Sequence, residues 1–322
     1  MTSKPGLFRL VQTVAAALAF GAASAAFAQS FPSKPVRWIV PFPPGGATDV
    51  VVRLISPKFS ERIGQPVIVE NIGGAGGNIG HEAVARAKPD GYTLLYAIPA
   101  LVLNPFYFKV AVDPAEFTGV IQTTGLTSVL LASNGFAPRT VADIVALVKA
   151  KPGTVSCAQP GSLPAVGCEL LKTYAGDMIM VPYKGVAPAM TALISGEVNL
   201  LFDLGPTAMP PVKAGRVRAI ATAYPKRGVP PFPELPAVAE TIPGFDLTSW
   251  QGVVVAAATP KEIVQRLNRD LGTALAHPEV RQRLAETGVD VIGGTAEAYD
   301  GLLKRDYKRF AAVLKNAGIK PE

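Results

Sequence analysis

Short apolar runs alternate with amphipathic stretches along nearly the whole of this chain. Such runs are typical of buried strands, and the stretches between them are typical of helices that pack on a sheet. The alternation predicts an α/β protein with largely parallel sheets, because parallel strands need long crossover connections. The expected strands are Val36–Val40, Val67–Glu70, Thr93–Ala97, Gly119–Gln122, Ser128–Ser133, Thr154–Cys157, Met178–Val181, Val198–Phe202, Val217–Ala221 and Gly252–Ala257. The expected helices are Asp49–Ser60, Gly80–Ala87, Val141–Lys151, Pro164–Tyr174, Ala187–Ser195, Thr207–Ala214, Lys261–Ala276, Glu279–Thr287 and Ala296–Asn316.

Proline adds two local expectations. Pro57 lies inside the first expected helix and predicts a kink or an early stop there, since proline removes a helical hydrogen bond. The Pro-rich stretch Tyr224–Pro243 predicts an irregular loop.

The N-terminus has the features of an export signal. Lys4 and Arg9 precede the Ala-rich apolar run Leu10–Phe27, and Ala26-Phe27-Ala28 is an A-x-A cleavage site. We expect a signal peptide over residues 1–28, cut after Ala28, and a product in the periplasm. The alternative is an uncleaved membrane anchor, which an Ala-rich segment ending in small residues disfavours.

The mature chain is too long for one small core and suits two lobes. Two segments could carry the chain between them, near Ser128–Ser133 and near Thr248–Val254. We therefore expect a discontinuous first lobe, residues 29–130 plus 248–322, and a continuous second lobe, residues 131–247. Ligand sites of open α/β sheets favour the cleft between such lobes.

The net charge and the supply of reactive side chains narrow the classes of function that this chain could have. The 31 Lys and Arg against 24 Asp and Glu give +7, and removing Lys4 and Arg9 with the signal leaves +5. This scattered excess suits an anionic ligand rather than nucleic acid. The chain has only two histidines and no G-x-S-x-G nucleophile elbow, so we expect no enzyme, no metal site and no cofactor.

The loop Pro41-Phe42-Pro43-Pro44-Gly45-Gly46-Ala47-Thr48-Asp49 follows the first strand and opens a helix. Two glycines let backbone N–H groups approach a ligand, and a helix N-terminus attracts anions. There is no P-loop lysine signature, so carboxylate is the first anion to consider. The alternative is an ordinary turn in which Thr48 or Asp49 caps the helix.

A second glycine-rich loop, Asn71–Gly80, also lies between a strand and a helix. Its glycine spacing fits a dinucleotide fingerprint poorly, so a backbone cradle beside the first loop is the better interpretation, and two unrelated turns are the alternative. In the second lobe, Tyr183 could face the cleft, Ser162 could donate a hydroxyl, and Asp203 could accept from a ligand or simply form a turn.

Cys157 and Cys168 are the only cysteines. An even pair in an oxidising compartment indicates a disulfide between a strand end and the following helix. Two buried free thiols are the alternative.

Several motifs in this order resemble the Bug family of extracytoplasmic solute receptors, the binding subunits of tripartite tricarboxylate transporters. They are the first loop, Gly74–Gly80, Lys88-Pro89-Asp90-Gly91-Tyr92-Thr93-Leu94-Leu95, Val181-Pro182-Tyr183-Lys184-Gly185, Phe202-Asp203 and Trp250-Gln251-Gly252. The resemblance implies a type II periplasmic-binding-protein fold that closes on a small organic carboxylate. It also implies ligand contacts from Phe42, Gly46, Ala47, Asp49, Gly77, Asn78, Ile79, Ala97, Ser162, Tyr183 and Asp203.

The chain also departs from that family's pattern. Ala165 stands where a His is common, Leu204 where an Asn is common, and His81 where a small residue is usual. The lost polar groups suggest a ligand with a less polar distal part, such as an aromatic or short aliphatic acid. We expect a monomeric receptor that serves membrane permease subunits; the alternative is a receptor that presents its ligand to a membrane signalling protein.

Overall fold

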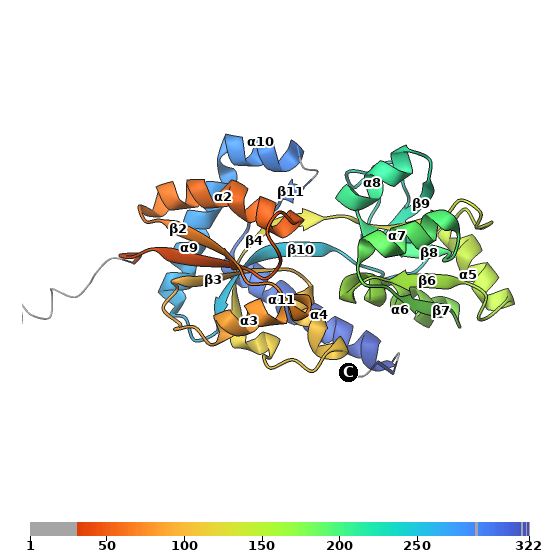
Figure 1. The fold of residues 1–322 in the computed structure, drawn as a ribbon, viewed down its shortest axis with the longest axis horizontal. Coiled ribbons are helices and arrows are strands. Elements are labelled where there is room, and N and C mark those ends of the chain that lie inside the picture. Colours follow the sequence, from red (N-terminus) through yellow and green to blue (C-terminus); the bar gives the residue numbers. More distant parts are fainter. Residues whose placement is uncertain (1–30, 287–288, 317, 320, 322) are drawn as a thin grey trace, which may run out of the picture.

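The computed structural model describes residues 31–286, 289–316, 318, 319 and 321 (Figure 1). The predicted signal peptide therefore lies outside the described residues. Within the described residues, no helix is both long enough and apolar enough to cross a bilayer.

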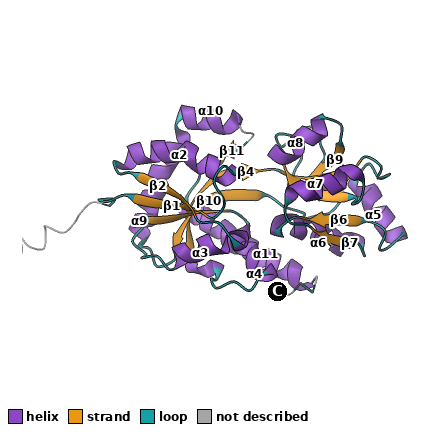
Figure 2. Cartoon of the chain, viewed as in Figure 1, coloured by secondary structure: helices purple, strands orange, loops and turns teal. Residues whose placement is uncertain are grey.

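Two mixed sheets form the centres of two lobes (Figures 1 and 2). The first sheet has the order β11-β4-β10-β3-β1-β2. Its strands are β1 (Val36–Val40), β2 (Val67–Asn71), β3 (Thr93–Ala97), β4 (Phe117–Leu126), β10 (Ser249–Ala256) and β11 (Asp290–Val291). The parallel strands β1, β2 and β3 are adjacent, whereas β10 runs antiparallel to both β3 and β4.

Helices cover both faces of the first sheet and bury its central strands β1, β3 and β10. Trp38 of β1 packs in one apolar cluster with α2 (Ala47–Ile63), α9 (Lys261–Ala276) and α10 (Pro278–Glu286). The next residue, Ile39, points to the opposite cluster, as the period of two in a strand requires. That cluster includes residues of α3 (Asn78–Ala85), α4 (Ala100–Tyr107) and α11 (Ala296–Asn316).

The second sheet has the order β7-β6-β8-β5-β9. Its strands are β5 (Ser128–Ser133), β6 (Ser156–Gln159), β7 (Ile179–Pro182), β8 (Leu200–Leu204) and β9 (Val217–Thr222). Its helices are α5 (Val141–Ala150), α6 (Ser162–Ala175), α7 (Val186–Ser195) and α8 (Gly205–Lys213). Residues of α5 and α6 share one apolar cluster with this sheet, and residues of α7 and α8 share another.

The chain passes between the sheets twice. Thr127 separates β4 from β5, and β10 begins just after Thr248. The pairing of Gly252 with Ala97 places the carboxyl end of β3 beside the start of β10. The pairing of Ser128 with Leu204 likewise places the carboxyl end of β8 beside the start of β5. The carboxyl ends of both parallel groups therefore face the crossover, where open α/β sheets bind ligands.

Trp250 and Gln251 fix β10 just after the crossover. The Trp250 indole nitrogen donates to Asp306 Oδ2 of α11 at 2.7 Å, and Gln251 Oε1 accepts from the Tyr96 hydroxyl at 2.9 Å. Both residues are buried, so their polar groups need these partners. The Trp250-Gln251-Gly252 motif thus holds the crossover strand.

Several element bounds differ from the predicted ones, and three differences concern helices. The α2 helix continues through Pro57 to Ile63; the proline is on the exposed face, and burial of Phe59 and Ile63 holds the last turns. The α4 helix was not predicted, because its sequence is apolar on all sides and contains Pro105. The α6 helix begins at Ser162, two residues before the predicted Pro164.

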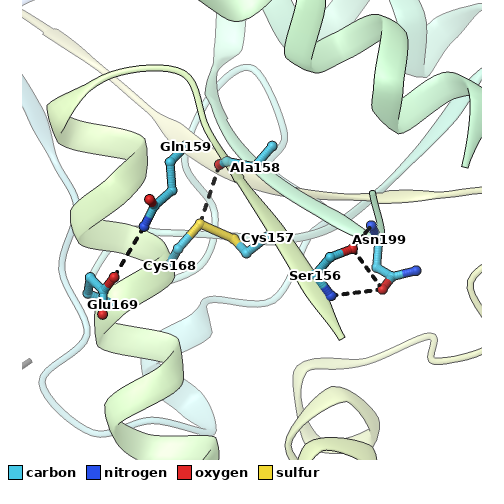
Figure 3. Close-up of a disulfide and its surroundings, with 7 residues drawn as sticks. All are labelled: Ser156, Cys157, Ala158, Gln159, Cys168, Glu169 and Asn199. Carbon is cyan, nitrogen blue, oxygen red and sulfur yellow. Dashed lines mark hydrogen bonds between the residues drawn. A yellow bond between two sulfur atoms is a disulfide. The ribbon is translucent and has the colours of Figure 1, made fainter. Parts of the chain in front are cut away.

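A disulfide joins Cys157 of β6 to Cys168 of α6, with their Cα atoms 6.0 Å apart (Figure 3). The alternative of two free thiols is therefore wrong. On the same helix Glu169 is buried, and its Oε1 accepts from Gln159 Nε2 at 3.2 Å. Burial raises the pKa of Glu169. The bridge fixes α6 to the strand that precedes the Ser162 loop.

Candidate functional site

The first loop ends in a helix N-terminus that no side chain caps. Gly46 is the N-cap residue of α2, with an extended backbone and no side-chain hydrogen bond to the first turn. The first N–H groups of a helix have no partner within the helix. Gly45 and Gly46 are both exposed, so this end of α2 can be reached from solvent.

The Asp49 carboxylate holds the first loop in place through hydrogen bonds. It is 3% exposed, and its Oδ2 accepts from the Gly45 N–H at 2.9 Å. Arg53 Nε donates to both Asp49 oxygens at 3.0 Å. Burial acts to raise the pKa of Asp49, but the hydrogen bonds from Arg53, Gly45 and Asn71 outweigh it and hold the pKa below its usual value. Asp49 was predicted to contact the ligand, but both of its carboxylate oxygens already accept hydrogen bonds from neighbouring groups of the protein.

The second loop turns sharply and also ends in an uncapped helix. Gly77 is the N-cap of α3 with φ of 100° and no side-chain hydrogen bond. Ala75, with φ of 48°, is the one non-glycine residue at positive φ in the described chain. Ile79 in the first turn of α3 is 51% exposed. The Gly77 N–H donates to the Gly74 carbonyl and the Asn78 N–H to the Ala75 carbonyl, so the start of α3 contributes chiefly the positive end of its helix dipole.

The two loops pack directly against each other. Asn71 Nδ2 donates to the Phe42 carbonyl at 3.1 Å and to Asp49 Oδ1 at 2.9 Å. A methyl group on Gly80 would lie 2.7 Å from Cβ of Pro41. This spacing leaves no room for a side chain at Gly80. The two loops thus form one unit rather than two unrelated turns.

Asn104 of α4 ties down the far side of the second loop. Its Nδ2 donates to the Gly76 carbonyl at 3.0 Å and to Asn78 Oδ1 at 2.8 Å. Asn104 is 2% exposed, so both bonds are shielded from water. Asn78, predicted as a ligand residue, has its side-chain oxygen occupied by this contact.

The sites predicted in the second lobe lie at the carboxyl ends of its parallel strands. Ser162 begins α6 after the β6 loop and is partly exposed. Asp203 lies near the end of β8 and is 3% exposed. Its Oδ1 accepts from the Leu204 N–H and from Thr207, each at 2.8 Å, whereas its Oδ2 has no partner. Burial raises the pKa of Asp203 to about 6.

Two predicted residues are placed less favourably for ligand contact. The Tyr183 hydroxyl donates to Glu197 Oε1 at 3.2 Å, beyond the end of α7. Ala97 is fully buried and pairs with Gly252 in the first sheet. Any contact from Ala97 would therefore come from its backbone or from the residues that follow it.

A cavity of about 200 Å³ lies behind the second loop. Its lining residues are Ala75, Asn78, Ile79, His81, Glu82, Leu101, Pro105 and Lys109–Val112. His81 is 4% exposed and its Nε2 has no hydrogen-bond partner. Burial lowers the pKa of His81 to about 4, so the ring is neutral at neutral pH.

Sequence reasoning missed the residues that hold the loops. The side chains that hold the two loops in place were not predicted to have this role; they are those of Arg53, Asn71 and Asn104. A signal existed for Arg53, because it stands four residues after Asp49 on a helix. No local signal connects Asn104 to the second loop, since α4 itself was not recognised.

The fold and the paired loops define the class of protein to which this chain belongs. Two α/β lobes carry helix N-termini at a shared crossover, which is the architecture of a periplasmic solute-binding receptor. The family model described as "Tripartite tricarboxylate transporter family receptor" matches residues 51–319. The chain therefore belongs to the tripartite tricarboxylate transporter receptor family, as the motifs predicted, and it is a solute-binding receptor.

Individual relatives agree with this assignment. Protein BugT of Bordetella pertussis is 32% identical over 313 residues, covering 93% of this chain and 94% of the relative. The structure of R. palustris Rpa4515 with adipate has a TM-score of 0.75 and 33% identity, and covers 91% of this chain and 100% of that one. MatC (Rpa3494) from Rhodopseudomonas palustris with bound malate has a TM-score of 0.71 and 33% identity, and covers 88% of this chain and 100% of that one. The fold and the family are those of receptors rather than enzymes.

Proposed function

We propose that this chain captures a small organic carboxylate between its two lobes in the periplasm and delivers it to membrane permease subunits. One observation carries the proposal: the uncapped N-termini of α2 and α3 lie on two loops that pack together as one unit. The N–H groups in the first turn of α2 and the dipoles of both helices favour a negative group at that place. Charge-assisted hydrogen bonds to a carboxylate are strong, so this cradle can bind the charge without a basic side chain.

The class of ligand draws support from relatives. The structures with adipate and with bound malate are those of similar receptors, and both ligands are dicarboxylates. Mechanistically, the ligand bridges the lobes and shifts the population from open to closed forms. Phe42, Gly46, Ala47, Gly77 and Ile79 would contact one carboxylate, and Ser162 and Asp203 would face the rest of the ligand. The division into residues 29–130 plus 248–322 and 131–247 stays a prediction, and the crossings at Thr127 and Thr248 support it.

We propose further that the chain has no catalytic activity and works as a monomer after cleavage behind Ala28. The two histidines support the first point: His81 lies on α3 and His277 just after α9, whereas Ser162 starts α6 in the other lobe. Hydrolysis of esters or amides that disappears in Ser162→Ala would contradict this point. Sedimentation of the mature protein tests the second.

Calorimetric titration with mono-, di- and tricarboxylates tests the binding function. The decisive pair of variants is Gly46→Leu and Gly135→Leu. Both glycines are exposed, have ordinary φ and leave room for a Cβ, so both variants should fold. Gly46→Leu should abolish binding by covering the N-terminus of α2, and Gly135→Leu, in a turn of the second lobe, should bind like the wild type. Equal affinities for the two variants would remove the first loop from the site.

A further inference from the structure

Asp246 lies just before the second crossing of the chain, and the residues on both sides of it are bound to the second lobe. The ring of Phe245 stacks on that of Phe202 in β8, with the ring centroids 5.7 Å apart. The N–H of Leu247 donates to the Ala223 carbonyl at 2.8 Å. The backbone of Asp246 is therefore fixed to the second lobe and moves with it.

Arg309 belongs to α11, which is fixed to the first sheet at two points. Asp300 Oδ1 accepts from the Gly119 N–H of β4 at 3.1 Å, and Asp306 Oδ2 accepts from the Trp250 indole of β10 at 2.7 Å. Arg309 Nη2 donates to the other oxygen of Asp306 at 3.0 Å. The guanidinium is therefore held by a residue that is itself anchored to the first lobe.

The same guanidinium contacts the second lobe. Arg309 Nη1 donates to the Asp246 carbonyl at 2.7 Å and lies 3.5 Å from Oδ2 of the Asp246 carboxylate. Thr248 orients this carboxylate, because its N–H and its hydroxyl donate to Asp246 Oδ1 at 2.9 Å and 2.6 Å. Arg309 thus joins the two lobes beside the second crossing.

The helix starts that face the crossover are accessible to solvent in this arrangement of the lobes. Gly46 at the start of α2 and Gly161 at the start of α6 are both exposed, and Ile79 in the first turn of α3 is 51% exposed. A closed receptor buries most of the surface of a small ligand and covers the groups that bind it. The contact of Arg309 with Asp246 is therefore made while the lobes are open.

Closure requires the lobes to rotate about the two crossings. Asp246 then moves with the second lobe while Arg309 stays with the first, and a hydrogen bond weakens steeply when its geometry is distorted. We propose that Arg309 is a positioning residue that holds the lobes open through Asp246 and thereby lowers the affinity of the receptor for its ligand. This inference rests on the proposed function. The apparent affinity falls with the fraction of molecules that can adopt the binding-competent form, so a contact specific to the open form weakens binding.

The affinities of three variants test this role. Arg309→Gln removes the charge and shortens the side chain, so adipate or malate should bind about three- to ten-fold more tightly than to the wild type. Asp246→Asn keeps the backbone carbonyl and an acceptor for Thr248 but loses the charge, so it should give a smaller change in the same direction. Arg227→Gln removes an exposed ion pair with Glu240 inside the second lobe and should bind like the wild type.

Pulsed EPR on the ligand-free protein measures the arrangement of the lobes without any binding. Spin labels on Glu61→Cys of α2 and Lys213→Cys of α8 report the distance between the lobes, because both positions are exposed and each lies in a different lobe. Adding Arg309→Gln should raise the fraction of molecules with the shorter distance.

Two results would overturn this inference alone: an unchanged distance distribution in Arg309→Gln, or an affinity of that variant no higher than that of the wild type. A wild-type protein that binds no carboxylate would overturn the proposed function. The distance measurement needs no ligand, so it separates a failure of the proposed function from a failure of the role of Arg309.

Discussion

Asn71 and Asp49 are joined across the two loops of the first lobe, with Asn71 Nδ2 donating to Asp49 Oδ1 at 2.9 Å. Asn71 ends β2, and Asp49 lies in the first turn of α2. Arg53 closes the arrangement, because its guanidinium donates both to Asp49 and to Asn71 Oδ1. The polar side chains next to the cradle therefore bind one another, and Asp49 also accepts from the Gly45 N–H of the loop.

Asn71→Ala should lower both the stability of the fold and the affinity for carboxylate. The variant loses the bonds to Asp49 and to the Phe42 carbonyl, which should cost about 1–2 kcal/mol of unfolding free energy. Carboxylate affinity should fall by about ten-fold, because the two loops are no longer fixed to each other. Calorimetry and urea unfolding measure the two effects. Asn134→Ala is the matched control, since Asn134 makes a similar bond to the Gly215 carbonyl on an exposed turn; an equal loss of affinity there would contradict the prediction.

Gly80→Ala should push the two loops apart, because the added methyl group would clash with Pro41 of the first loop. Its Cβ would lie 2.7 Å from Cβ of Pro41 and 2.8 Å from the Ile72 carbonyl oxygen. Overpacking of this kind costs about 1–3 kcal/mol, and we expect binding to be lost with it. Gly272→Ala, within α9, has only an ordinary contact at 3.7 Å from Ile121 and should be neutral or stabilising. The expectation fails if urea unfolding gives the two variants the same stability.

Removing the disulfide should lower stability without removing the site. Cys157 and Cys168 are separated by 11 positions, and a loop of that size is worth about 3 kcal/mol. The double variant Cys157→Ala, Cys168→Ala should lose about that much free energy of unfolding, yet bind ligand normally while folded. Wild-type protein in reductant should approach the stability of the double variant. A double variant that keeps the full wild-type stability would contradict the argument.

The pH dependence of stability should contain two opposite contributions. The pKa of His81 falls from 6.5 to about 4 on folding, so the unfolded state binds more protons there and stability decreases as pH falls through that range. The pKa of Asp203 rises from 3.8 to about 6 on folding, so the native state binds more protons and stability increases as pH falls from 6 to 4. Each shift corresponds to about 3 kcal/mol at most.

Single variants should separate these two contributions. Compared with the wild type, His81→Gln should gain stability as pH is lowered from 7 to 4, and Asp203→Asn should lose it. The double variant should follow the wild-type profile, because both contributions are removed together. Urea unfolding at four or five pH values measures all four proteins, and parallel profiles for the single variants would show that neither group titrates as described.

Much of the fold was accessible from the sequence. Strands such as Val36–Val40 and Thr93–Ala97 have the predicted bounds, because an apolar run between turn residues specifies a buried strand locally. The long amphipathic helices Lys261–Ala276 and Ala296–Asn316 also have the predicted bounds. The prediction failed at α4, where the sequence is apolar on all sides and carries no helical period. The early stop that Pro57 could cause does not occur, because tertiary burial of the last turns outweighs one lost hydrogen bond.

The sequence by itself determined the alternation of elements, the two glycine loops at strand ends and the family to which the chain belongs. These features depend on local residue patterns and on their order. Only the tertiary structure decided which polar groups find partners within the protein. Asp49 looked like a site residue but is held by Arg53 and Asn71, whereas the unpaired Nε2 of His81 lies beside Gly77. A hydrogen bond or an unpaired buried atom of this kind depends on contacts between separate loops and helices, and no local pattern records them.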